Sequence, residues 1–161
     1  MSERARGLAD RFEQASQEIV RTVERCSEGE WRATTSGEGW SVGVVAHHVA
    51  EGHKAIAGLV QMAATGQPLP ALTMEMLDQA NAKYARQQAN GTRAETLELL
   101  RQNAASAAAT VRGLSDEQLN RTASALTGTP PMSVHQMIER ILIGHIQEHL
   151  GSIRATTGAH S

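Results

Sequence analysis

Apolar residues recur at intervals of three and four over long stretches of the chain, the spacing that places them on one face of an α-helix. In residues 3–26 these positions are Leu8, Phe12, Ala15, Ile19 and Val23. No stretch shows a convincing alternation of apolar and polar residues, which is the pattern of a half-buried β-strand. The sequence therefore predicts an all-α fold.

Residues that start and stop helices divide the chain into segments. Ser41, Thr73, Thr92 and Ser133 are suited to helix N-termini, because their hydroxyl oxygens can accept a backbone hydrogen bond there. The predicted helices cover residues 3–26, 42–64, 74–89, 94–112 and 134–156, with a loop rich in Gly, Ser and Thr over 27–40. A capped short turn of helix is predicted at 115–118, and a second loop at 127–131.

The two middle segments are separated only by a short break around Asn90 and Gly91, so they are predicted as one kinked helix or two pieces. Counted together, they give four main helices of roughly 20 residues, each about 30 Å long. Amphipathic helices of that length bury their apolar faces against one another in a bundle. We predict a four-helix bundle with a kinked or split third helix, forming a single domain over residues 1–161.

Composition and charge support this fold and narrow the classes of function. Aromatic residues make up only 2% of the chain, and the predominance of Ala and Leu favours helices. The net charge of −2, with basic residues spread along the chain, gives no footprint for nucleic acid. No apolar stretch approaches the roughly 20 residues that cross a bilayer. The N-terminus lacks a signal-peptide pattern, and Cys26, the single cysteine, is expected to be a buried structural residue. A cytoplasmic protein without nucleic-acid or membrane partners is expected.

Two of the seven histidines, His145 and His149, lie four residues apart in the last predicted helix and therefore share one face. They continue an inward row that begins with Val134, Ile138 and Ile141. A second apolar row runs beside it, formed by Met137, Leu142, Ile146, Leu150 and Ile153. The pair is therefore expected to face the core, either as two hydrogen-bonded core histidines or as metal ligands.

A third histidine favours the metal interpretation. Two buried neutral imidazoles each need partners for one donor and one acceptor, and a metal ion removes part of that need. His48 lies on the edge of the apolar stripe of the second predicted helix, whereas His47 is rotated from it by about 100°. Three imidazoles would leave coordination positions open for water or substrate, as in catalytic sites. The roles of His53 and His135 are left open.

Residues 145–149, His-Ile-Gln-Glu-His, also match the H-x-x-E-H pattern of inverted zincins. Proteases of that type need another metal ligand well downstream on a separate helix. Only twelve residues follow His149, and none of them is acidic. We reject this interpretation. Glu148 is retained as a candidate general base, beside the alternative that it is a solvated flanking residue.

Two short motifs resemble those of the DinB-like superfamily. The first is Trp40-Ser41-Val42, followed eight residues after the tryptophan by His48; the second is His145-x-x-x-His149 followed by leucine. The resemblance extends over most of the chain. It implies a four-helix bundle with an up-down-down-up connection and a metal ion bound by His48, His145 and His149.

The same resemblance carries expectations about function. Members commonly bind zinc or nickel and often form homodimers. They include mycothiol-dependent maleylpyruvate isomerase and bacillithiol S-transferases, which activate a low-molecular-weight thiol. A metal-dependent thiol S-transferase or hydrolase acting on a small molecule is therefore expected, and a non-catalytic metal-binding or stress-response bundle is the alternative.

Four further residues are candidates for the surroundings of the expected site. Asn81 and Tyr84 are candidates to line its pocket or to play an ordinary structural role. Trp40 is expected to anchor the loop over the start of the second helix. Glu51 is a candidate to orient a ligand imidazole, or to form a surface salt bridge.

Overall fold

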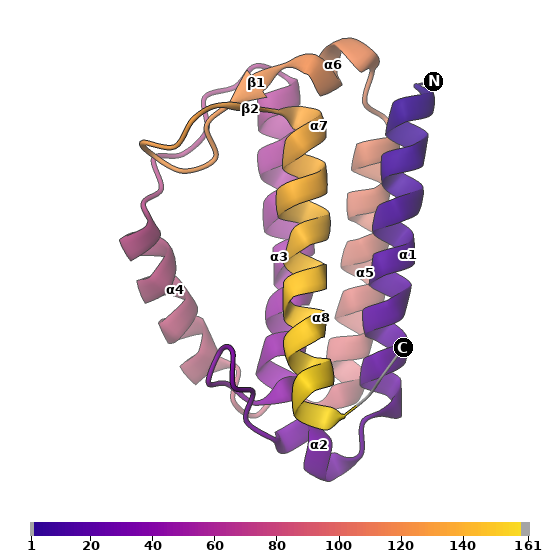
Figure 1. The fold of residues 1–161 in the computed structure, drawn as a ribbon, viewed down its shortest axis with the longest axis vertical. Helices are drawn as coiled ribbons and strands as arrows, with labels where there is room; N and C mark the ends of the chain where they lie inside the picture. The colour runs from indigo at the N-terminus through magenta and orange to yellow at the C-terminus, as the bar shows by residue number, and fades with distance from the viewer. Residues whose placement is uncertain (1, 159–161) are drawn as a thin grey trace.

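Four long helical stretches lie side by side in the computed structural model of the chain, which describes residues 2–158 (Figure 1). They are α1 (Glu3–Arg25), α3 (Val42–Ala64), α5 (Arg93–Arg112) and a final stretch of α7 (Val134–Met137), the π-helix η1 (Ile138–Ile143) and α8 (Gly144–Thr157). The shorter helices are α2 (Glu28–Arg32), α4 (Met74–Gln87) and α6 (Asp116–Asn120). Strands β1 (Thr122–Ala123) and β2 (Met132–Ser133) form a small antiparallel pair. The predicted four-helix bundle is confirmed.

The order of the helices around the bundle follows from one long connection. Helix α1 packs against α5, α5 against α3, α3 against α8, and α8 against α1. Figure 1 shows α3 and α5 pointing the same way, because α4 runs back along the outside between them. The first and last helices both point the opposite way. This is the up-down-down-up order that the family resemblance implies.

The third bundle helix is α5 alone. The sequence left open one kinked helix or two pieces, and the structure has two helices that lie apart. None of the α4 residues is buried, and Met74 and Met76 are half exposed or more, at 57% and 50%. Helix α4 is thus the crossover connection of the bundle and contributes nothing to its core.

The four predicted N-caps are confirmed. The hydroxyl groups of Ser41, Thr73, Thr92 and Ser133 each accept a hydrogen bond from the backbone N–H three residues later. The predicted loop over 27–40 differs from the structure, since it contains α2. A capping box at the start of α2, in which Ser27 and Glu30 exchange hydrogen bonds, explains this short helix.

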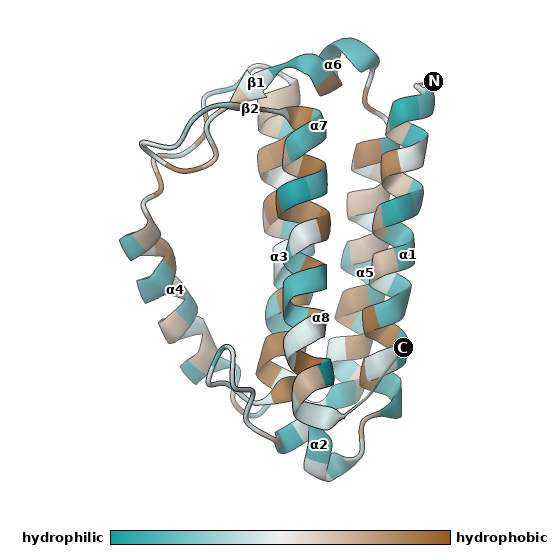
Figure 2. Ribbon diagram, viewed as in Figure 1, coloured by the Kyte–Doolittle hydropathy of each residue, from teal (hydrophilic) through white to brown (hydrophobic). Residues whose placement is uncertain are grey.

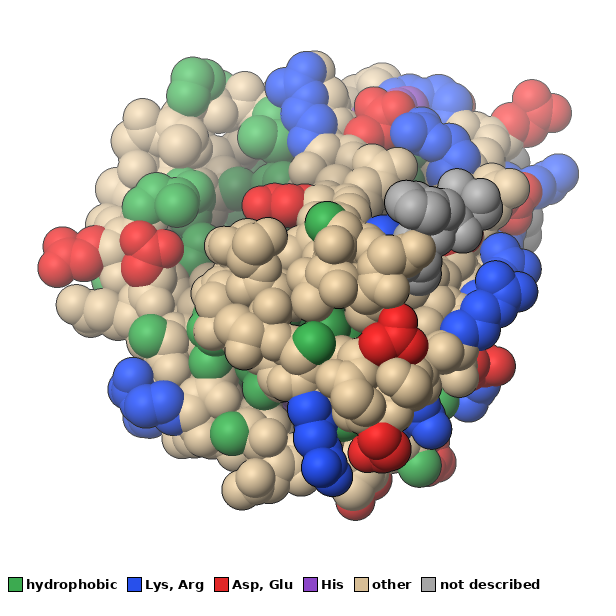
Figure 3. All heavy atoms as spheres, turned by 60° about the horizontal axis from the view of Figure 1, so that its bottom comes forward, with side chains coloured by type: hydrophobic (Ala, Val, Ile, Leu, Met, Phe, Trp, Pro, Cys, Tyr) green, Lys and Arg blue, Asp and Glu red, His purple; other side chains and the backbone are tan. Residues whose placement is uncertain are grey.

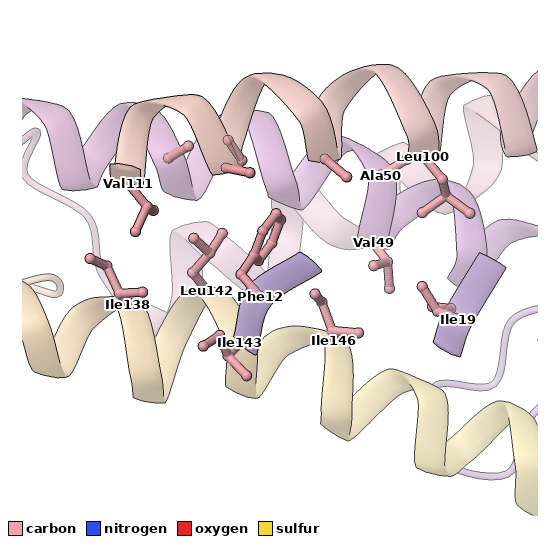
Figure 4. Packing of buried hydrophobic residues seen from close by; sticks show 14 of the residues in the cluster. Phe12, Ile19, Val49, Ala50, Leu100, Val111, Ile138, Leu142, Ile143 and Ile146 are labelled. Atoms are coloured by element: carbon pink, nitrogen blue, oxygen red, sulfur yellow. The ribbon is translucent and has the colours of Figure 1, made fainter. Parts of the chain in front are cut away.

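The bundle core is made almost entirely of aliphatic side chains, as the composition predicts. Figure 4 shows Phe12 of α1 among Leu142, Ile143 and Ile146 of the last helix. In Figure 2 each bundle helix carries brown, hydrophobic turns beside teal, hydrophilic ones. Cys26 is buried, as predicted, and its thiol donates to the backbone carbonyl of Thr22. Among the described residues, no helix has the length and apolar character needed to cross a membrane.

The last bundle helix contains a π-helical segment directly before the histidine pair. The N–H of Gly144 donates to the carbonyl of Glu139, five residues back. A π turn accommodates one extra residue, and such turns are frequent at functional sites. It explains why Met137 and Leu142 are both fully buried although they lie five residues apart. Because of this extra residue, the apolar residues Ile146, Leu150 and Ile153 of α8 face the core. The two histidines lie beside this apolar row.

Candidate metal centre

Three imidazoles meet where α3 passes α8. One nitrogen from each of His48, His145 and His149 lies within 4.8 Å of the other two. The ring centroids are separated by 4.9 Å for His48 and His145, 5.1 Å for His48 and His149, and 4.6 Å for His145 and His149. The structure thus brings together the three residues that the sequence selects.

Two of the donor atoms have the spacing that one divalent ion requires. Zinc lies about 2.0–2.1 Å from an imidazole nitrogen, which puts two donors of a tetrahedral site about 3.3 Å apart. The Nε2 atoms of His48 and His145 are 3.1 Å apart. Three nitrogens without a carboxylate suit zinc, nickel or copper better than magnesium or calcium. The residues present therefore fit a transition-metal ion.

Electrostatics keep two of these rings in the form that binds metals. Burial, together with the charge that His149 would carry, lowers the pKa of His48 to about 4. Burial lowers the pKa of His145 to about 3, with the other two histidines of the cluster adding to the effect. Both imidazoles are therefore neutral at neutral pH, with a free nitrogen lone pair for a cation.

Gly52, one turn after His48 on α3, provides the space for His145. A Cβ atom at this position would lie 2.4 Å from Cε1 and 2.7 Å from Nδ1 of the His145 ring. Any side chain larger than hydrogen would displace the imidazole. The sequence shows that Gly52 lies near the apolar stripe of its helix. It does not show that the His145 ring of α8 packs against this residue.

Glu38 holds the third imidazole, and it was not among the residues selected from the sequence. Its carboxylate Oε2 lies 3.2 Å from Nδ1 of His149, and Oε1 accepts a hydrogen bond from the hydroxyl of Ser152. The side chains of Glu38 and His149 are only 11% and 12% exposed. A carboxylate on Nδ1 fixes the ring orientation and leaves Nε2 free for a metal.

The loop that carries Glu38 is tied down on both sides of it. Thr34 pairs with Ser41 in an isolated β-bridge, and the N–H of Thr35 donates to the carbonyl of Trp40. Gly37 approaches Ser152 so closely that a Cβ would lie 2.9 Å from the serine hydroxyl oxygen. Trp40 packs against the core, as predicted, and its ring meets that of His48 edge to face at 5.4 Å.

His47 points to a different partner, the hydroxyl of Tyr84 on α4, which contacts its Nδ1. The Tyr84 ring also packs against His48, with centroids 5.8 Å apart. Burial raises the pKa of Tyr84, and the charge of Glu51 raises it further, so the phenol keeps its proton. Asn81, one turn earlier on α4, is half-buried. Glu51 forms no ion pair within residues 2–158, so the predicted surface salt bridge is not observed there.

The other candidates lie away from the three imidazoles. His135, at the start of the last helix, contacts Arg4 and Glu139. Glu148 is exposed on α8. His160 lies outside the described residues.

On the face seen in Figure 3, acidic and basic side chains are interspersed, and a hollow with hydrophobic side chains lies on the side where α4 is found.

Comparison with known proteins agrees with this arrangement. The family model of the DinB superfamily matches residues 11–153, which include every residue of the cluster and Glu38. The chain belongs to the DinB superfamily. A comparison with curated proteins gives no match for this superfamily member.

One solved structure shares the fold of this DinB-superfamily chain. It is described as YfiT from Bacillus subtilis, a probable metal-dependent hydrolase with an unusual four-helix bundle topology. The two structures superpose with a TM-score of 0.79 at 18% sequence identity, over 98% of this chain and 89% of YfiT. At that identity the likeness establishes the fold alone.

Proposed function

We propose that this chain is a metal-dependent enzyme that holds one zinc or nickel ion with His48, His145 and His149. The convergence of these three imidazoles carries the proposal. Three protein ligands leave at least one position of a tetrahedral ion open, which distinguishes catalytic from purely structural sites. When bound, the ion would lower the pKa of a water or thiol at that position and so supply a nucleophile at neutral pH.

The surrounding residues prepare the site for this role. Glu38 keeps the far nitrogen of His149 occupied, so that ring presents Nε2 inward. Trp40 and Tyr84 cover two sides of His48, which limits water at that ligand. The phenol of Tyr84 stays protonated, and its contact with Nδ1 of His47 holds the ring against His48.

A thiol is the nucleophile that we favour, in a low-molecular-weight-thiol-dependent S-transferase. A free thiol has a pKa near 8.5, whereas that of bulk water is about 15.7, so a thiol needs less help from the protein to lose its proton beside a metal ion. Glu38 is already committed to His149 and Ser152, and Glu148 is exposed. Hydrolysis is the second candidate, favoured by the description of YfiT as a probable metal-dependent hydrolase.

The test is an activity screen on protein reconstituted with zinc or with nickel. Electrophilic substrates are offered with mycothiol, with bacillithiol or without a thiol, and activated esters and amides are offered alone. Turnover that needs both metal and thiol supports the transferase. Metal-dependent turnover without a thiol identifies a hydrolase instead. The His48→Ala variant should lose either activity.

A non-catalytic role is favoured by one observation: all three imidazoles come from only two helices, α3 and α8. An ion there would join these helices and add its binding free energy to folding. This alternative predicts a large loss of thermal stability on chelation together with no turnover in the screen. Equal stability of the metal-free and metal-loaded proteins would refute it.

A further inference from the structure

His53 is a buried histidine that the proposed site does not yet use. It lies on α3, five residues after His48, and its side chain is fully buried. Within residues 2–158, three buried side-chain nitrogens have no hydrogen-bond partner. Two of them are the ring nitrogens of His53, and the third is Nδ1 of His145. All of the unpaired nitrogens therefore belong to two imidazoles.

Sequence adjacency places His53 beside the point where α3 meets the His145 ring. His53 directly follows Gly52, whose missing side chain makes room for the His145 ring. The Phe12 ring of α1 packs against His53 in a T-shaped arrangement, with centroids 5.1 Å apart. Burial lowers the pKa of His53 to about 4, so at neutral pH it has one donor and one acceptor to offer.

A metal-binding imidazole nearly always donates its other ring N–H to a protein group or a water, because that bond fixes the ring and strengthens its donor nitrogen. His149 has such a partner in Glu38, 3.2 Å away. His145 has a free Nδ1 in a buried position. Among the described residues, the other buried polar side chains are engaged elsewhere: Ser16 lines a surface pocket beside Glu13 and Arg101, and the hydroxyls of Thr22, Thr35 and Thr96 donate to backbone carbonyls of their own segments. His53 is therefore the buried group that can serve His145.

We propose that His53 is a positioning residue for the metal ligand His145, accepting the hydrogen bond of its Nδ1–H either directly after a small ring shift or through one bound water. This inference rests on the proposed metal site. It gives His145 the same kind of support that Glu38 gives His149. It also explains why a core of aliphatic side chains retains an imidazole with two unpaired nitrogens.

The test compares His53→Leu with His53→Asn and His53→Gln. Zinc affinity is measured by competition with a chromophoric chelator, and the melting temperature is measured on metal-free protein. His53→Leu should bind zinc about 10- to 100-fold more weakly, the usual effect of removing such a partner. Its metal-free melting temperature should equal or exceed that of the wild type, because an unpaired polar group leaves the core. One of the two amide variants should recover most of the affinity, while His135→Leu should bind zinc as the wild type does.

A merely structural His53 gives the opposite pattern, in which the leucine variant melts at a lower temperature and binds zinc with unchanged affinity. That result would overturn the inference while leaving the metal site intact. Failure of the wild type to bind zinc would instead refute the proposed function. If the leucine variant does not fold, nitrogen-15 NMR of the zinc-loaded wild type decides. A slowly exchanging Nδ1 proton on His145, close to the His53 ring, is expected; a rapidly exchanging one would refute the proposal.

Discussion

The substitution Gly52→Ala tests how tightly the bundle positions the metal site. The new Cβ would lie 2.4 Å from Cε1 of His145, whereas non-bonded carbons rest about 3.5 Å apart or more, so the ring must retreat by about 1 Å. Metal–ligand distances tolerate only about 0.2 Å. We therefore expect zinc affinity to fall at least about 10-fold, the lower range for disturbance of a ligand's position.

The matched control lies six residues along the same helix. A Cβ at Gly58 meets nothing within 4 Å, and this residue is exposed. Gly58→Ala should leave zinc affinity unchanged and raise stability by up to about 1 kcal/mol, because alanine is the better helix former. Zinc competition and thermal unfolding are measured on both variants. A Gly52→Ala protein that binds zinc as tightly as Gly58→Ala would refute the close fit between α3 and His145.

Two further predictions concern the charges around the site. Glu38→Ala should weaken zinc binding about 10- to 100-fold, because His149 loses the group that orients it. Zinc titration measures this affinity, and a wild-type value in the variant would contradict the prediction. The metal-free protein should lose stability as the pH falls from 6.5 towards 4. His48 and His53 have folded-state pKa values lowered to about 4, and that of His145 is lowered to about 3, so the unfolded chain takes up protons first. Unfolding curves at pH 7.5, 6 and 5 check this, and a midpoint independent of pH would rule it out.

The parts of the structure that depend on neighbouring residues were predictable from the sequence. Serine and threonine caps placed four helix starts, because a cap bonds a backbone group only three residues away. The histidine pair was placed inward because it continues an apolar row. The π-helix coincides with a feature of the sequence: the apolar row is otherwise spaced by three and four, but Met137 and Leu142 are five residues apart.

The parts that depend on contacts between distant segments were not predictable. Glu38 reaches His149 across 111 residues, from a loop whose composition indicates only turns. The role of Gly52 depends on which face of α8 meets it. Helix α4 has caps and a helical pattern as good as those of its neighbours, and nothing local shows that it stays outside the bundle. His53 was left open because its spacing from His48 does not reveal what lies across the core.

The central claim is that one divalent ion is held by the three imidazoles. Its most direct test is metal content by elemental mass spectrometry on untagged protein, beside a His145→Ala, His149→Ala double mutant. The account predicts about one zinc or nickel ion per chain in the wild type and a loss of that ion in the mutant. Absence of metal from the wild type even after reconstitution, or equal metal content in the mutant, would contradict it.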